Sequence, residues 1–152
     1  MNTITQLLSS INPANPKFAE SAFLNWSLLP ATSKGKMGEE VAKELLKENG
    51  YEVAERNSKE HDYICNGKMI ELKTAFLKKD SDYFTFYGYD ATEDPHFWDL
   101  QFVFPEEIFI IRMDRKAMAD IYLGKTRKNT MFTITLEDAL DAQGETVAYF
   151  SV

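Results

Sequence analysis

The chain has 152 residues and is 44% hydrophobic, which fits one globular domain with a sizeable core and leaves little room for a second. Its single cysteine, Cys65, excludes an internal disulfide framework, and with only two histidines no zinc site of cysteine and histidine is expected. The net charge of −7 argues against non-specific nucleic-acid binding, because neutralising phosphates requires clustered lysine and arginine.

Residues 1–32 are predicted to be a helical extension on a core of residues 33–152, all within one domain, 1–152. The extension lacks the basic start and apolar run of a signal peptide, and no stretch approaches the ~18 apolar residues of a membrane span. We therefore expect an intracellular protein with no membrane partner. Phe18, Phe23 and Trp26 recur at helical spacing, which predicts packing against the core or a dimer partner.

Residues 33–50 carry the clearest helical pattern, with Ser33 as a possible cap and Gly50 as the stop. The phase of this helix places Glu39 at the margin of the apolar stripe, where it leans towards the core. An ion pair with Lys43, one turn later, is the alternative role for Glu39. The apolar stripe is predicted to hold Met37, Val41, Ala42, Leu45 and Leu46. The solvated face is predicted to hold Glu40, Lys43, Glu44 and Lys47.

Three strands are predicted next, over residues 51–54, 62–65 and 68–74, and Asn66-Gly67 joins the last two as a two-residue hairpin turn. Counting outward from this turn pairs Asp62 directly with Glu71 across the ladder, with their Cβ atoms ~5 Å apart. Lys73 emerges on the same face, two residues beyond Glu71. The hairpin thus brings two acids and one lysine together.

Two carboxylates at ~5 Å would repel each other by about 3 kcal/mol at an effective dielectric constant near 20. A divalent cation such as Mg²⁺ would relieve this repulsion, because hard ions take carboxylate and water oxygens as ligands. Such a site would polarise a phosphate and generate a hydroxide nucleophile, which is the chemistry of phosphodiester hydrolysis. The spacing alone is equally compatible with a surface salt-bridge cluster of Asp62 and Glu71 around Lys73.

The rest of the chain predicts a mixed α/β core. Strands are expected at 84–86, 102–104, 108–113, 132–135 and 146–152, with a helix at 115–121 and a helical turn at 136–141. Among the remaining polar and aromatic residues, Cys65 is expected to be an inert packing residue and Trp98 a core or interface residue. His61 adjoins the hairpin and is compatible with either a phosphate contact or a structural role.

Basic residues are unevenly distributed, since residues 80–111 contain no lysine or arginine. A cluster follows directly, and it is either a DNA-facing patch or an ordinary solvated surface. The loop 125–129 is the best candidate in it for contacting phosphates. The cluster comprises Arg112, Arg115, Lys116, Lys125, Arg127 and Lys128.

The order of a glycine-glutamate helix, Asp62 and then Glu71-Leu72-Lys73 resembles the PD-(D/E)xK nuclease superfamily, which includes small restriction enzymes and Holliday-junction resolvases. The segments GEEVAKELLKENGYEVAERN and HDYICNGKMIELKTAF carry the resemblance and make up about a quarter of the chain. The sequence departs from the motif at His61, which stands where the family has proline.

This resemblance implies an α/β fold with a restriction-endonuclease-like core, a mixed central β-sheet flanked by helices. It implies that Glu39, Asp62, Glu71 and the backbone carbonyl of Leu72 bind Mg²⁺, for which Mn²⁺ can substitute, and that Lys73 orients the attacking water. Candidate DNA contacts are Lys34, Lys36, Thr74, Lys125, Arg127 and Lys128.

The function so implied is that of a Mg²⁺-dependent endodeoxyribonuclease of the restriction, recombination or phage type. It would act on DNA as a homodimer in the cytoplasm of a prokaryotic or phage-infected cell. The alternative is a catalytically inactive nuclease-fold module that binds DNA or another protein, which the acidic composition favours. An RNA-cleaving enzyme is a third possibility, for which the sequence offers no aromatic RNA-binding signature.

Overall fold

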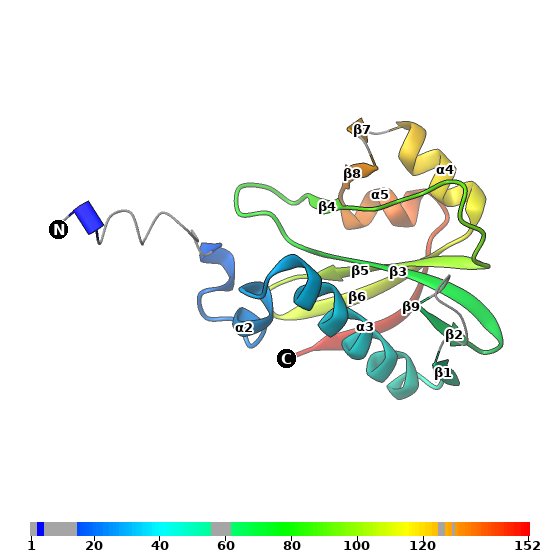
Figure 1. Cartoon of the computed structure of the whole chain (residues 1–152), viewed down its shortest axis with the longest axis horizontal. Helices are drawn as coiled ribbons and strands as arrows, with labels where there is room; N and C mark the ends of the chain where they lie inside the picture. The colour runs from blue at the N-terminus through cyan, green and yellow to red at the C-terminus, as the bar shows by residue number, and fades with distance from the viewer. Residues whose placement is uncertain (1–2, 5–14, 56–61, 125–126, 129) are drawn as a thin grey trace.

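The computed structural model describes residues 3–4, 15–55, 62–124, 127–128 and 130–152, which form two β-sheets and a small number of helices (Figure 1). The larger sheet has six strands in the order β1-β2-β3-β5-β6-β9, and the smaller has three in the order β4-β8-β7. The larger sheet is mixed, because β3 and β5 run parallel whereas its other neighbouring strands are antiparallel. The mixed α/β class predicted from the sequence is therefore confirmed.

The strands of the larger sheet are β1 (Val53–Glu55), β2 (Tyr63–Cys65), β3 (Lys68–Phe76), β5 (Phe97–Val103), β6 (Glu107–Met113) and β9 (Glu145–Ser151). The smaller sheet consists of β4 (Phe84–Phe86), β8 (Met131–Ile134) and β7 (Arg127–Lys128). The helices are the short 3-10 helix η1 (Pro16–Phe18), α2 (Leu24–Ser27), α3 (Ala31–Glu48), α4 (Arg115–Gly124) and α5 (Leu136–Asp141). No helix in these described stretches is long and apolar enough to span a bilayer.

The two faces of the larger sheet are covered by different elements (Figure 1). Helix α3 lies across one face, where the side-chain amide of Gln101 on β5 donates to the carbonyl of Gly38 at 3.0 Å. On the opposite face Phe102 packs edge-on against Phe84 of β4, with ring centroids 4.9 Å apart. Successive residues of a strand point to opposite faces, so β5 joins the two layers through neighbouring side chains.

Helix α3 starts two residues earlier than expected, because Pro30 is its N-cap and Ser33 lies inside the first turn. Gly50 ends the helix as predicted, with a φ of 90° that glycine adopts without strain. The prediction of a solvated Lys43 was wrong. Lys43 is only 6% exposed, because β1 passes beside the helix and brings Glu55 within 2.9 Å of its ammonium group. Met37, assigned to the apolar stripe, is 44% exposed.

The N-terminal extension packs against the core, as predicted from its aromatic spacing. Phe18 is fully buried, and its ring and that of Trp26 both meet Phe76 of β3 edge-on. Phe23 contacts Phe150 of β9, with ring centroids 6.2 Å apart. The extension therefore fixes the end of β3 that lies farthest from the hairpin turn.

Strand β5 begins at Phe97, five residues before the predicted strand. The early part was not predicted because it contains polar residues, which are unusual in a buried strand. Asp99 is fully buried and accepts hydrogen bonds from Arg112 Nε at 2.8 Å, Arg112 Nη2 at 2.9 Å and the Tyr63 hydroxyl at 2.6 Å. Burial lowers the pKa of Arg112, but Asp99 raises it more, so the guanidinium stays charged. Arg112 is therefore a core residue and does not belong to a basic surface patch, contrary to expectation.

The close approach of α3 to β3 depends on Gly38. A Cβ atom added to Gly38 would lie 2.6 Å from Thr74 Oγ1, and this hydroxyl is itself within 3.0 Å of the Gln101 amide nitrogen. Any larger residue at position 38 must therefore displace the Thr74 side chain or push α3 away from the sheet.

We predict that Gly38→Ala lowers the free energy of unfolding by roughly 1–3 kcal/mol, because overpacking outweighs the better helix propensity of alanine. Gly35→Ala is the matched control in the same helix, where a Cβ would meet nothing within 4 Å. That variant should gain about 0.5–1 kcal/mol. Urea unfolding measures both, and stabilisation by Gly38→Ala would contradict the packing described here.

Candidate functional site

The hairpin between β2 and β3 has the turn and register predicted from the sequence. Asn66 and Gly67 have φ values of 47° and 77°, the pair of positive angles that a type I′ turn requires. The ladder pairs Cys65 with Lys68, Ile64 with Met69 and Tyr63 with Ile70. Asp62, which precedes Tyr63, therefore lies beside Glu71, which follows Ile70.

Asp62 is held beside Glu71 by hydrogen bonds to the residues on either side of Glu71. Its N–H donates to the carbonyl of Ile70 at 3.0 Å, and its carboxylate Oδ2 accepts from the N–H of Leu72 at 2.7 Å. The Asp62 carboxylate lies close enough to Glu71 to raise the pKa of its carboxyl group. The two acids thus form a close pair at the point where β2 ends.

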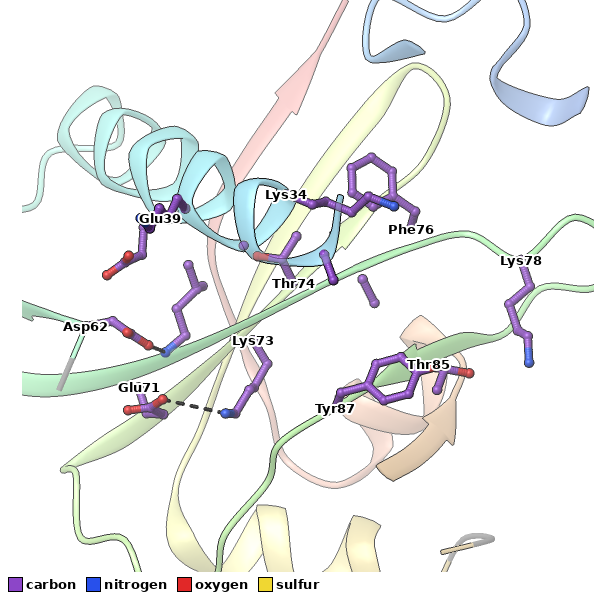
Figure 2. Close-up of a pocket in the computed structure, with 15 residues that line it drawn as sticks. Lys34, Glu39, Asp62, Glu71, Lys73, Thr74, Phe76, Lys78, Thr85 and Tyr87 are labelled. Carbon is purple, nitrogen blue, oxygen red and sulfur yellow. Dashed lines mark hydrogen bonds and ion pairs between the residues drawn. The ribbon is translucent and has the colours of Figure 1, made fainter. Parts of the chain in front are cut away.

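Lys73 completes this group from the same strand. Its Nζ lies 3.5 Å from Glu71 Oε1 (Figure 2). The same Nζ donates to the carbonyl of Gly88 at 2.9 Å. Gly88 follows β4 and has a φ of 78°, which favours glycine at this position. The Glu71 and Lys73 side chains are only 13% and 14% exposed, so the ion pair expected as the alternative to a metal site is present, but it is largely buried and not solvated.

Burial raises the pKa of Glu71 from 4.5 to about 8, and the nearby charge of Asp62 adds to this effect. The ammonium group of Lys73 opposes the shift but does not cancel it. At neutral pH the Asp62 and Glu71 pair therefore retains one proton, which removes most of the like-charge repulsion expected from the sequence.

These side chains line an open cavity of about 710 Å³ along the edge of β3 (Figure 2). Strand β2 pairs only with β3 residues up to Ile70, so among the described residues β3 has no partner on that side beyond this point. Helix α3 forms one wall of the cavity and β4 the other. All the predicted site residues whose side chains are described contribute to the lining: Lys34, Lys36, Glu39, Asp62, Glu71, Leu72, Lys73 and Thr74.

Glu39 reaches the cavity from α3, whereas Glu71 projects from β3 (Figure 2). In the described part of the chain, no three His, Cys, Asp or Glu side chains lie close enough together to hold a metal ion. The closely spaced oxygen donors are the two carboxylates of Asp62 and Glu71. The carbonyl of Leu72 joins them, because its N–H bonds to Asp62 and both main-chain groups of a strand residue point to the same edge. This donor set fits Mg²⁺, which uses one or two carboxylates and several waters.

Lys34 and Thr74 are tied to neighbouring residues within the cavity wall. The Lys34 ammonium lies 5.1 Å from the centre of the Phe76 ring, and burial lowers its pKa. The Thr74 hydroxyl is occupied by the Gln101 amide. Thr74 thus positions α3 against β3, in addition to lining the cavity.

The basic loop predicted over residues 125–129 is not confirmed, because Arg127 and Lys128 form strand β7 and pair with Phe132 and Met131. The side chains of Arg127 and Lys128 are outside the described part of the structure, and so are the whole residues Lys125 and His61. His96 has a structural role, since its Nδ1 accepts from the N–H of Met69 at 2.9 Å.

Four residues of the site were missed by sequence reasoning, namely Lys78, Thr85, Tyr87 and Gly88. The apolar residues around Thr85, Tyr87 and Gly88 predicted a strand and gave no sign of which face would meet the hairpin, and no element was predicted around Lys78. A tyrosine followed by glycine directly after a short aromatic strand was the only available signal.

The raised pKa of Glu71 predicts a stability that depends on pH. The folded chain retains a proton that the unfolded chain releases above pH 4.5, so stability should fall as pH rises from about 4.5 to about 8. The loss should be roughly 3–5 kcal/mol, and Glu71→Gln should abolish it, because the amide does not ionise. Urea unfolding at pH 5 and pH 8.5 measures the difference. The exposed Glu106→Gln variant is the control, and parallel pH profiles for wild type and Glu71→Gln would refute the assignment.

No protein family matches the sequence, and neither does any curated protein. Among solved structures, a bacterial homing endonuclease, I-Ssp6803I, resembles the chain at 11% sequence identity and a TM-score of 0.49, over 70% of this chain and 75% of that one. This likeness is too distant to support an inference about fold or chemistry, so the site rests on its own geometry.

Proposed function

We propose that the chain is a Mg²⁺-dependent endonuclease that hydrolyses phosphodiester bonds of DNA with a PD-(D/E)xK site on a restriction-endonuclease-like core. One observation carries the proposal. Asp62, Glu71 and Lys73 converge at the edge of β3 where β2 ends, inside a cavity open to a substrate. Carboxylates that retain a proton together, beside a half-buried lysine, are the kind of perturbed group that marks a catalytic site.

Asp62, Glu71 and the Leu72 carbonyl would hold the ion, with Glu39 contributing from the opposite wall of the cavity. When bound, Mg²⁺ or Mn²⁺ would polarise the scissile phosphate and lower the pKa of a coordinated water. Binding requires Glu71 to lose its proton, so the affinity of the site for metal should increase as the pH rises towards 8.

Lys73 is positioned to act on the attacking water or on a phosphate oxygen. Its ammonium group is fixed between Glu71 and the Gly88 carbonyl, so little side-chain freedom remains to be lost when a substrate binds. In this role it orients the nucleophile through a hydrogen bond.

A polyanionic substrate agrees with the distribution of charge in the cavity. The lining carries four lysines and three carboxylates, so it is net positive in a chain with a net charge of −7. An ion bound to the carboxylates would increase this contrast. We include in the proposal a homodimer, which would place two centres against two DNA strands, and a cytoplasmic location in a prokaryotic or phage-infected cell.

A catalytically inactive DNA-binding or protein-interaction module is the second candidate. The acidic net charge and the separation of Glu39 from the other two acids favour it. The two functions differ in one measurable property, since an inactive module should show no Mn²⁺ binding in calorimetry that depends on Glu71.

The proposal predicts that purified protein cleaves supercoiled plasmid, branched DNA or single-stranded DNA with Mg²⁺ or Mn²⁺, and that chelator abolishes this cleavage. Asp62→Ala and Lys73→Ala should each lower the cleavage rate by roughly 10²- to 10⁴-fold. Glu39→Gln should also lower it, whereas Glu40→Gln, on the adjacent exposed residue, should not. Metal-independent cleavage, or full activity in Asp62→Ala, would refute the proposal.

A further inference from the structure

Tyr87 is an aromatic residue in the cavity that the hydrolytic chemistry does not use. It is 68% exposed, although it lines the wall formed by β4 (Figure 2). The alternation of β4 explains its direction, because Phe84 and Phe86 point into the core while Thr85 and Tyr87 point into the cavity. An exposed ring in a concave site is available to stack on a planar group of a ligand.

The position of Tyr87 is linked to that of the catalytic lysine. Gly88 is the next residue, and its carbonyl accepts the hydrogen bond from Lys73 Nζ at 2.9 Å. Consecutive Cα atoms lie about 3.8 Å apart, so the tyrosine and the lysine are fixed to the same short piece of chain. A planar group stacked on Tyr87 would therefore lie next to the phosphate that Lys73 contacts.

The cavity extends along β3 away from the acids, and lysine side chains line this part of it. Lys34 lies above Phe76, and Lys78 lines the far end. From Glu71 to Lys78 an extended chain covers roughly 23 Å, at about 3.3 Å per residue. This length accommodates several nucleotides of one strand, with carboxylates at one end and lysines along the remainder.

We propose that the cavity binds a single DNA strand and that Tyr87 stacks on an unpaired base beside the scissile phosphate. Inside a continuous duplex, neighbouring base pairs cover both faces of every base, so the ring could stack only on a base that is unpaired or flipped out. The substrate class is therefore DNA with unpaired nucleotides at the cut, such as single-stranded, gapped or flapped DNA. This inference rests on the proposed function and specifies its substrate.

Equilibrium binding in chelator tests the stacking without requiring cleavage. Fluorescence anisotropy would compare a single-stranded oligonucleotide, a blunt duplex of the same sequence and that duplex with a three-nucleotide gap. Wild type should bind the single-stranded and gapped DNA more tightly than the blunt duplex. Tyr87→Ala should weaken binding to those two ligands roughly 5- to 100-fold, whereas Tyr87→Phe, which keeps the ring, should retain most of the affinity.

Two matched controls separate a specific site from general surface effects. Tyr83 is 45% exposed but does not line the cavity, so Tyr83→Ala should bind like wild type. Lys78→Ala should reduce the dependence of log affinity on log salt concentration by about 0.7, while the adjacent Lys79→Ala should change it little. Because Tyr87 is exposed, thermal unfolding should confirm that its variants remain folded.

Three results would overturn the inference: unchanged affinity in Tyr87→Ala, an equal loss in Tyr83→Ala, or tighter binding of the blunt duplex by wild type. Its failure is distinguishable from failure of the proposed function. Metal-dependent cleavage with no role for Tyr87 would remove the stacking inference alone. Stacking that depends on Tyr87 without any cleavage would support the strand-binding cavity and remove the hydrolytic function.

Discussion

The hydrogen bond from the Leu72 N–H to the Asp62 carboxylate, at 2.7 Å, is the contact on which the site depends. A backbone amide that would otherwise continue the ladder binds a side chain instead, at the position where β2 stops pairing with β3. This contact fixes Asp62 beside Glu71 and leaves the following part of β3 open on that side among the described residues. The same interaction therefore creates both the acid pair and the cavity that gives access to it.

The walls of the cavity are held in place by side chains that donate to backbone carbonyls. Gln101 links Gly38 on α3 to Thr74 on β3, and this close contact sets the position of α3 and of Glu39, the next residue along it. On the other side the Gly88 carbonyl connects the segment after β4 to Lys73. Each wall thus contributes one backbone carbonyl that ties a separate element to the central sheet.

The hairpin could be predicted because its geometry is local: Asn66-Gly67 determines the turn, and counting from the turn determines which residues face each other. The phase of α3 likewise placed Glu39 in the site. The early start of β5 could not be predicted, since Asp99 and Gln101 look unsuited to a buried strand until Arg112 and Gly38 are known to bind them. Tyr87 and Gly88 were missed because contacts between segments distant in sequence bring β4 to the hairpin, and local periodicity does not encode such contacts.

Titration of the Glu71 carboxyl group, followed by carbon-13 NMR with and without Mg²⁺, measures directly whether the acid pair binds metal. We predict a midpoint near pH 8 in metal-free protein and a lower midpoint at saturating Mg²⁺, because the bound cation favours the ionised carboxylate. Replacement of Asp62 by asparagine should lower the metal-free midpoint and remove the response to Mg²⁺. A Glu71 that titrates near 4.5 without metal, or one that Mg²⁺ leaves unchanged, would contradict the claim that this carboxylate pair is a metal-binding catalytic centre.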